Sequence, residues 1–231
     1  MKLDHIVWDE VRNLIHGHGY AILQRVLNKK ECDEIIGMYK KPSHFRKTIL
    51  MERYRFGIGE YKYLQYPLPE LIDTLRKRLY QHLYTIANEW NDMLKLEMQY
   101  PDSHEQFTNI CKANNQSLAT PLILKYGAGG YNTMHQDLYG KIYFPMQAVV
   151  FLNEPGEDYT GGQFVLTEQI PRAQSKAIVL QPQRGDILIF TTQFRPKKGS
   201  RGYYRVQMKH GVSEVKSGDR HTLGIIFHDA Q

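Results

Sequence analysis

The sequence predicts a mainly β chain of the α+β class, with helices in its first half and a β-barrel or sandwich in its second. Two observations lead to this prediction. Apolar residues recur at helical spacing in much of the chain before residue 97. After residue 116 the chain changes to short β-branched and aromatic runs separated by Gly, Pro, Asn or Asp. So many short strands are typical of a barrel or sandwich. We therefore expect residues 1–231 to form one functional unit, with 1–116 as mainly helical support and 117–231 as the β core.

Helices are expected at residues 6–17, 29–39 and 70–96. Asn28 can cap the second helix, and Glu31 stands at the capping-box position. The third and longest helix carries an apolar stripe, which predicts packing on a sheet: Leu71, Leu75, Leu79, Leu83, Ile86, Trp90 and Leu94.

A first strand is expected at residues 20–23, and residues 53–66, rich in tyrosine and glycine, are interpreted as loop and short strand. The strands of the β core are expected at residues 122–126, 147–153, 163–166, 177–181, 186–190, 204–209 and 222–228.

The composition is that of an ordinary globular protein, with 42% hydrophobic and 23% charged residues. The chain shows no apolar run long enough to cross a membrane and no signal peptide, so we expect no membrane association. Two cysteines, Cys32 and Cys111, are too few for a disulfide framework, which favours a reducing cytoplasm. The net charge of +6 permits binding to nucleic acid without requiring it.

The stretch LILKYGAGGYNTMHQD, residues 122–137, is the most informative part of the sequence. An apolar run and a glycine-rich turn lead to His135 and Asp137. Alternate residues of an extended strand point to the same side, so these two side chains can reach one metal ion. A single H-x-D pair is weak evidence, because it also arises by chance.

A second group lies downstream, where His210 ends a strand and Arg220 opens the last one. Two imidazoles and one carboxylate on one face suit non-haem Fe(II) that activates O₂. An arginine just beyond them can bind the far carboxylate of a dicarboxylic cosubstrate through two hydrogen bonds. Each residue alone could be structural, and the combination makes the site.

These motifs resemble the Fe(II)/2-oxoglutarate-dependent dioxygenase superfamily, and its prolyl-hydroxylase-like branch most. The resemblance covers about residues 122–228 and rests on YGxGG before H-x-D, then LNE, TGGQF, RGDILIF and HGVSxVxSGxR. It implies a double-stranded β-helix, or jelly-roll, core. It also implies that His135, Asp137 and His210 bind Fe(II), that Arg220 binds 2-oxoglutarate with help from Tyr126, and that O₂ is the oxidant.

Residues 53–90 and the C-terminal HTLGIIFHDA resemble a narrower bacterial family associated with oxidative dealkylation of damaged DNA. The resemblance implies hydroxylation of an N-alkyl group on DNA or RNA, and so a role in DNA repair. The sequence departs from AlkB-like enzymes, since His221 and Thr222 stand where those have a second arginine.

The segment RPKKGSRGYYR, residues 195–205, is the clearest basic cluster, and we expect its loop at the mouth of the barrel. Basic groups can neutralise phosphates and tyrosines can stack on bases. The expected substrate-binding residues are Arg195, Lys197, Lys198, Arg201, Tyr203 and Tyr204. An acidic peptide would suit this segment equally well.

Other readings stay open. The main alternative substrate is a protein side chain, as in prolyl hydroxylases. A non-redox, cupin-like metal-binding barrel and a non-catalytic nucleic-acid-binding module are alternatives to an oxygenase. His82, His221 and His228 are expected to be structural, and Glu168 to be a turn or rim carboxylate.

Overall fold

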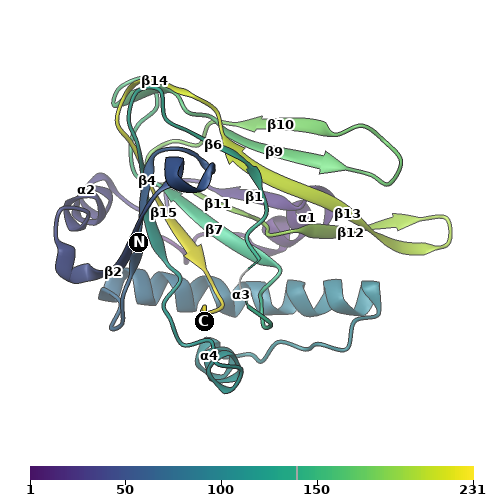
Figure 1. Cartoon of the computed structure of the whole chain (residues 1–231). Coiled ribbons are helices and arrows are strands. Elements are labelled where there is room, and N and C mark those ends of the chain that lie inside the picture. The colour runs from purple at the N-terminus through teal and green to yellow at the C-terminus, as the bar shows by residue number, and fades with distance from the viewer. Residues whose placement is uncertain (139) are drawn as a thin grey trace.

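In the computed structural model, which describes residues 1–138 and 140–231, two antiparallel sheets face each other, and helices cover the outer side of the larger sheet (Figure 1). The larger sheet has seven strands in the order β1 (Tyr20–Leu23), β11 (Ile187–Thr191), β7 (Met146–Phe151), β15 (Arg220–Ile226), β5 (Leu122–Tyr126), β4 (Glu60–Leu64) and β2 (Phe45–Leu50). The strands expected after residue 116 are present, with ends shifted by a few residues at most.

The smaller sheet has six strands. Five follow one path, in the order β10 (Lys176–Leu180), β9 (Phe164–Gln169), β13 (Gly202–Val212), β6 (Tyr131–His135) and β3 (Gly57–Ile58), and the sixth, β12 (Phe194–Gly199), pairs with β13 off this path. A separate pair joins β8 (Tyr159–Gly161) to β14 (Val215–Gly218). The long β12–β13 hairpin projects well beyond the body of the smaller sheet (Figure 1).

Four α-helices are described: α1 (Trp8–His18), α2 (Lys29–Met38), α3 (Glu70–Leu94) and α4 (His104–Ala113). The predicted capping box of α2 is confirmed, because Asn28 Oδ1 accepts from the Glu31 amide at 3.0 Å and Glu31 Oε2 accepts from the Asn28 amide at 2.8 Å. The prediction that α3 packs on a sheet is also confirmed. Its buried stripe shares one core with Ile123, Val150 and Leu223 of the larger sheet.

The strand β15 is buried on both sides, by the helix-side core and by the space between the two sheets. Leu223 and Ile225 belong to the helix-side core. The alternate positions Arg220, Thr222, Gly224 and Ile226 line a cavity between the two sheets. Both sides of β15 are therefore buried, as expected for a central strand.

The structure differs from the sequence prediction in three places. Residues 195–205 form β12 and part of β13 and are not a loop. The strands β2, β8 and β14 and the helix α4 were not predicted. Three strands from the first 116 residues, β1, β2 and β4, join the larger sheet, so the N-terminal part contributes to the sheet as well as covering it.

Among the described residues, no helix combines the length and the apolar character that crossing a membrane requires.

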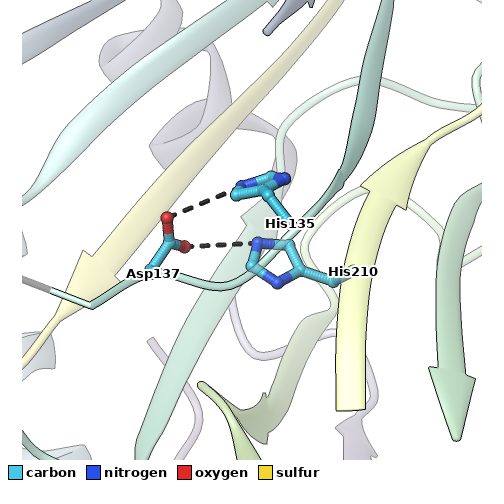
Figure 2. Close-up of side chains that lie close together, drawn as sticks. All are labelled: His135, Asp137 and His210. Carbon is cyan, nitrogen blue, oxygen red and sulfur yellow. Dashed lines mark ion pairs between the residues drawn. The ribbon is translucent and has the colours of Figure 1, made fainter. Parts of the chain in front are cut away.

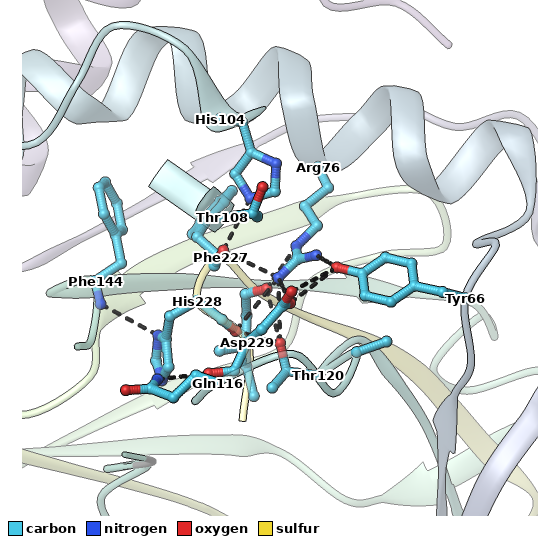
Figure 3. A network of polar contacts seen from close by, with 12 residues as sticks. Tyr66, Arg76, His104, Thr108, Gln116, Thr120, Phe144, Phe227, His228 and Asp229 are labelled. Atoms are coloured by element: carbon cyan, nitrogen blue, oxygen red, sulfur yellow. Dashed lines mark hydrogen bonds and ion pairs between the residues drawn. The ribbon is translucent and has the colours of Figure 1, made fainter. Parts of the chain in front are cut away.

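A buried ion pair fastens the C-terminal end of the sheet to α3 (Figure 3). Arg76 is 1% exposed and its Nη2 lies 2.9 Å from Asp229 Oδ1. The same guanidinium donates to the carbonyl oxygens of Ile226 and Phe227, and to the hydroxyl of Tyr66. Its charge and its donors are therefore satisfied without water, which is the condition for keeping an ion pair inside a protein.

This network yields a stability prediction. Arg76→Ala should lower the free energy of unfolding by about 3–5 kcal/mol, because it leaves Asp229 buried without its cation. Lys77→Ala is the matched control: Lys77 is the next residue of α3 and pairs with Asp73 in solvent at 2.7 Å. The control should cost about 0.3–0.5 kcal/mol. Urea unfolding followed by circular dichroism measures both, and equal losses would contradict the assignment.

Candidate metal centre

The three predicted ligands meet at one point between the sheets (Figure 2). His135 ends β6, and Asp137 follows two residues later. His210 lies on β13 directly opposite His135, because the two strands pair antiparallel in that register. The nitrogen and oxygen atoms that could bind a metal all lie within 4.8 Å of one another.

Both histidines turn Nε2 toward the carboxylate. His210 Nε2 lies 3.2 Å from Asp137 Oδ2, and His135 Nε2 lies 3.5 Å from Asp137 Oδ1. Nitrogen and oxygen atoms this close to one another, from two neutral imidazoles and one carboxylate, form the 2-His-1-carboxylate donor set. We infer that a divalent transition metal would fit among them.

Neighbouring groups fix the orientation of each imidazole. The Nδ1 of His135 lies 2.7 Å from the Thr133 carbonyl oxygen, which can only accept, so Nδ1 carries a proton and Nε2 is the nitrogen that the neutral ring would offer to a metal. The His210 ring is stacked on Phe164 at 5.8 Å between centroids and meets the edge of Phe190 at 4.8 Å. These two rings restrict the rotation of the His210 side chain, and its Nε2 faces Asp137.

Two glutamines hold the segment that carries Asp137. Gln147 of β7 is buried, and its Nε2 donates to Asp137 Oδ2 at 2.9 Å. Gln136 donates to the carbonyl oxygens of Gln193 and Met208. The analysis of the sequence did not single out either residue. A glutamine inside the apolar run MQAVVF was the one available indication for Gln147, since a buried amide needs a partner.

The charges of the three groups depend on one another. Burial raises the pKa of Asp137, but His210 and His135 overcome this effect and hold it well below its usual range. Burial lowers the pKa of His210, and the positive charge on His135 lowers it further. Burial also opposes protonation of His135, yet its contacts with Asp137 raise its pKa. The centre thus holds an ionised carboxylate beside a neutral His210.

A cavity of about 260 Å³ extends from the centre between the sheets. Arg220 lies in its wall, 1% exposed and directly opposite Tyr126 on β5. The guanidinium carbon lies 5.4–5.9 Å from the ring centres of Phe151, Tyr126 and Tyr159. None of its three nitrogens has a hydrogen-bond acceptor in the described part of the chain, and neither does the Tyr126 hydroxyl. Burial raises the pKa of Tyr126 to about 12, so this hydroxyl remains a donor.

A buried cation without an acceptor is costly, because its hydration is lost and nothing replaces it. An arginine fork and a neutral hydroxyl that share a cavity wall form a site for an anion, and a carboxylate matches the fork. The structure therefore places a candidate carboxylate site and a candidate metal site in one cavity.

The residues predicted for substrate binding lie elsewhere. Arg195 is buried in an ion pair with Glu168, 2.6 Å from Nη2 to Oε2. The others lie along the β12–β13 hairpin, and none of the six lines the cavity. Tyr203 is seven residues from His210 along one strand, which corresponds to about 23 Å at 3.3 Å per residue. The expected loop at the barrel mouth is thus a hairpin that points away from the metal centre, and its role in substrate binding stays a prediction.

The three histidines that were expected to be structural make contacts outside the centre. His82 stacks on Trp8 at 3.8 Å between ring centres. His221 Nδ1 lies 3.1 Å from Asn153 Oδ1, and His228 Nδ1 accepts from the Phe144 amide.

Solved structures with a similar fold are prolyl-hydroxylase-like. The chain matches a Pseudomonas putida prolyl-4-hydroxylase with a TM-score of 0.58 and 13% identity, over 97% of this chain and 100% of the other. It matches an oxidoreductase of the 2OG-Fe(II) oxygenase family from Burkholderia pseudomallei with a TM-score of 0.54 and 12% identity, over 100% and 95%. The predicted jelly-roll fold, mainly β with helical support, is confirmed. The fold is therefore that of prolyl-hydroxylase-like 2OG-Fe(II) oxygenases.

The sequence places the chain more narrowly. Residues 59–230 match the family Oxygenase-NA, which is described as an oxygenase catalysing oxidative methylation of damaged DNA. Uncharacterised proteins from two strains of Mycobacterium tuberculosis are 44% identical over 164 residues, which is 71% of this chain and 70% of theirs. The chain belongs to the Oxygenase-NA family and is an oxidoreductase.

The centre yields a prediction about metal binding. Asp137→Ala and His210→Ala should each abolish binding of Co(II), because two protein ligands are too few to hold it. Gln147→Ala should weaken binding about 10- to 100-fold, since it removes only a partner that orients Asp137. His82→Gln, outside the cavity, is the control. Isothermal titration measures all four, and unchanged binding by Asp137→Ala would exclude it as a ligand.

Proposed function

We propose that the protein is an Fe(II)- and 2-oxoglutarate-dependent dioxygenase that demethylates alkylated nucleic acid oxidatively. The observation that carries the proposal is the pairing, within one cavity, of the three-ligand centre with the unsatisfied guanidinium of Arg220. A metal site alone would suit many proteins. A metal site with a buried carboxylate receptor suits a dicarboxylic cosubstrate.

His135, Asp137 and His210 would hold Fe(II). Their donor set of two nitrogens and one oxygen is the one that such oxygenases use, and it leaves positions for other ligands. The hydrogen bond from Gln147 to Asp137 Oδ2 would hold the carboxylate in place for metal binding.

Arg220 would bind the far carboxylate of 2-oxoglutarate, and the Tyr126 hydroxyl would donate to the same group. The two residues stand opposite each other on β15 and β5, so sheet pairing fixes their separation. Tyr126 is fully buried and Arg220 is 1% exposed, so the carboxylate would be shielded from water when it binds.

When bound, iron, 2-oxoglutarate and O₂ supply an oxidation that yields succinate, CO₂ and a hydroxylated substrate carbon. On an N-methyl group, hydroxylation is followed by release of formaldehyde and the demethylated base. The residues of this chain bind and orient the reactants and keep water from the cavity.

Nucleic acid is the substrate that the family description and the surface charge support. The β9–β10 and β12–β13 hairpins project side by side (Figure 1) and carry exposed basic residues. We propose that they contact phosphates some distance from the reacting nucleotide, through Lys197, Lys198 and Arg201, with Tyr203 and Tyr204 beside them. Arg195 would support the hairpin through its ion pair with Glu168.

The alternative substrate is a protein side chain. Two solved structures of similar fold, from Pseudomonas putida and Trichoplax adhaerens, are named as a prolyl-4-hydroxylase and a prolyl hydroxylase bound to a peptide fragment. A cupin-like barrel without redox chemistry is a weaker candidate, because it gives no role to the buried Arg220. The free thiols of Cys32 and Cys111 support a reducing compartment such as the cytoplasm.

The cosubstrate site can be tested apart from catalysis. Arg220→Ala should weaken 2-oxoglutarate binding by about 1.5–3 kcal/mol, the range for a charge-assisted hydrogen bond, and leave metal binding intact. Calorimetry on protein loaded with Mn(II), which prevents turnover, measures both. Lys125→Ala is the control, since Lys125 is 39% exposed and pairs with Asp219. If only the control lost affinity, Lys125 would be the carboxylate ligand.

The substrate can be tested directly. The protein with Fe(II) and 2-oxoglutarate should release formaldehyde from methylated oligonucleotides and reduce their mass by the equivalent of one CH2, because hydrogen replaces the methyl group. The triple variant Lys197→Ala, Lys198→Ala, Arg201→Ala should bind oligonucleotides with a shallower dependence on salt, because fewer phosphates are neutralised.

Mass spectrometry of a cytosolic extract treated in parallel detects the alternative activity, hydroxylation of a protein side chain. A peptide that gains one oxygen, with no change in the oligonucleotides, would assign the enzyme to protein hydroxylation.

A further inference from the structure

An exposed aromatic pair lies at the rim of the cavity. Tyr54 and Phe56 are 53% and 45% exposed, and their rings stack with centroids 5.5 Å apart and planes 18° apart. Phe56 also lines the cavity, together with Thr133 and His135. Other exposed apolar side chains nearby are Ile58 of β3, Tyr131 on the paired strand β6, and Leu138, which also lines the cavity. Exposed apolar side chains gathered at a catalytic cavity mark a binding surface.

The segment that carries the pair, residues 51–58, is held firmly. The Phe56 carbonyl oxygen accepts from both the amide and the hydroxyl of Thr133, each at 2.9 Å. Gly57 pairs with Asn132 of β6 at a φ of +138°. A Cβ there would lie 2.2 Å from the Tyr131 carbonyl oxygen, so only glycine allows the strands to approach this closely. The rings therefore lie on a preorganised backbone segment that is bonded to Thr133, two residues before the candidate ligand His135.

The same segment carries two free cations. Arg53 and Arg55 are exposed, and neither side chain donates a hydrogen bond or forms an ion pair to any described residue. One acidic residue, Glu52, stands beside them in the sequence. Arginine next to exposed aromatic rings is the composition of surfaces that bind single-stranded nucleic acid, in which bases stack on rings and phosphates meet cations.

We infer that residues 53–56 are the stacking platform that receives a nucleotide next to the one entering the cavity. This inference rests on the proposed function. A base can reach a buried metal only after it leaves the stack of its neighbours, so the neighbours lose a stacking partner. The rings of Tyr54 and Phe56 replace that partner at the entrance, and Arg53 and Arg55 contact the flanking phosphates. The platform acts close to the reaction, whereas the hairpins act about 23 Å away.

A peptide is the other occupant that aromatic side chains can bind. The observations favour nucleic acid, because every nucleotide carries both a base for the stacked rings and a phosphate for the arginines on either side of Tyr54, whereas a peptide needs acidic residues at matching positions. The sequence suggested residues 195–205 as the nucleic-acid-binding surface. It did not point to residues 53–56, because their aromatic residues follow no period that would predict which side of a strand or helix they share.

The test is binding of a fluorescein-labelled oligothymidylate of about 12 nucleotides, a length within the site sizes of such surfaces. Fluorescence anisotropy is measured with metal-free protein and with protein loaded with Mn(II) and 2-oxoglutarate. Tyr54→Ala and Phe56→Ala should each weaken binding roughly 5- to 150-fold, the equivalent of losing one stacked base. Tyr54→Phe and Phe56→Tyr should restore it. Arg53→Ala and Arg55→Ala should each flatten the plot of log affinity against log salt by about 0.7.

Leu14→Ala on α1 is the matched control, since Leu14 is 43% exposed and lies outside the cavity. It should bind as the wild type does. All variants should keep the wild-type melting temperature, because the altered side chains are exposed. Wild-type affinity in Tyr54→Ala and Phe56→Ala would overturn the inference, as would absence of oligothymidylate binding by the wild type.

The two proposals fail separately. Loss of binding in the platform variants, combined with no formaldehyde from any methylated oligonucleotide, would support the platform and reject demethylation. If Tyr54→Ala and Phe56→Ala demethylate oligonucleotides as the wild type does, the platform is rejected and the proposed demethylase function is retained.

Discussion

The antiparallel pairing of β6 with β13 is the constraint on which the site depends. It places His210 opposite His135, although the two residues are far apart in the sequence. A slip of one residue would turn His210 to the other face of the sheet and dismantle the centre. The register is secured on both sides of β13, because β9 pairs with it along its other edge and Gln136 bonds to the Met208 carbonyl. The pairing of these two strands thus brings the two histidines of the candidate metal site together.

Charge inside the cavity is compensated unequally. Asp137 is surrounded by two imidazoles and by Gln147, whereas the guanidinium of Arg220 lies near aromatic rings and its nitrogens have no hydrogen-bond acceptor among the described residues. Cation–π contacts recover on the order of 0.5–2 kcal/mol each, less than the loss of hydration that a buried cation suffers. Arg76, equally buried, is fully bonded and paired with Asp229. This contrast is the one expected between a cation that stabilises the fold and a cation that binds a ligand, as we propose for Arg220.

The sequence was sufficient for the elements whose residues repeat with a clear period, such as α3 and the strands of the β core, and for the three candidate ligands. It failed where edge strands break the usual composition. β12 reads FRPKKG, and proline with lysines predicts a loop; the strand pairs only with β13, so its other edge tolerates a residue without an amide proton. Gln147 and Phe56 could not be assigned either, because their roles depend on which strands meet, and periodicity along one segment does not contain that information.

The division between core and rim explains why the reaction class is easier to infer than the substrate. Two of the candidate metal ligands, His135 and His210, and the candidate carboxylate-binding residue Arg220 lie on paired strands, so the pairing of the strands fixes their positions. The proposed substrate contacts lie on residues 51–58 and on the two hairpins, away from these positions. The segment 51–58 links the two parts, because its backbone is bonded to β6 while its rings face solvent. Thr133 therefore connects the proposed substrate-binding segment to the candidate metal centre. Its amide and hydroxyl donate to the carbonyl oxygen of Phe56, and its own carbonyl oxygen orients His135.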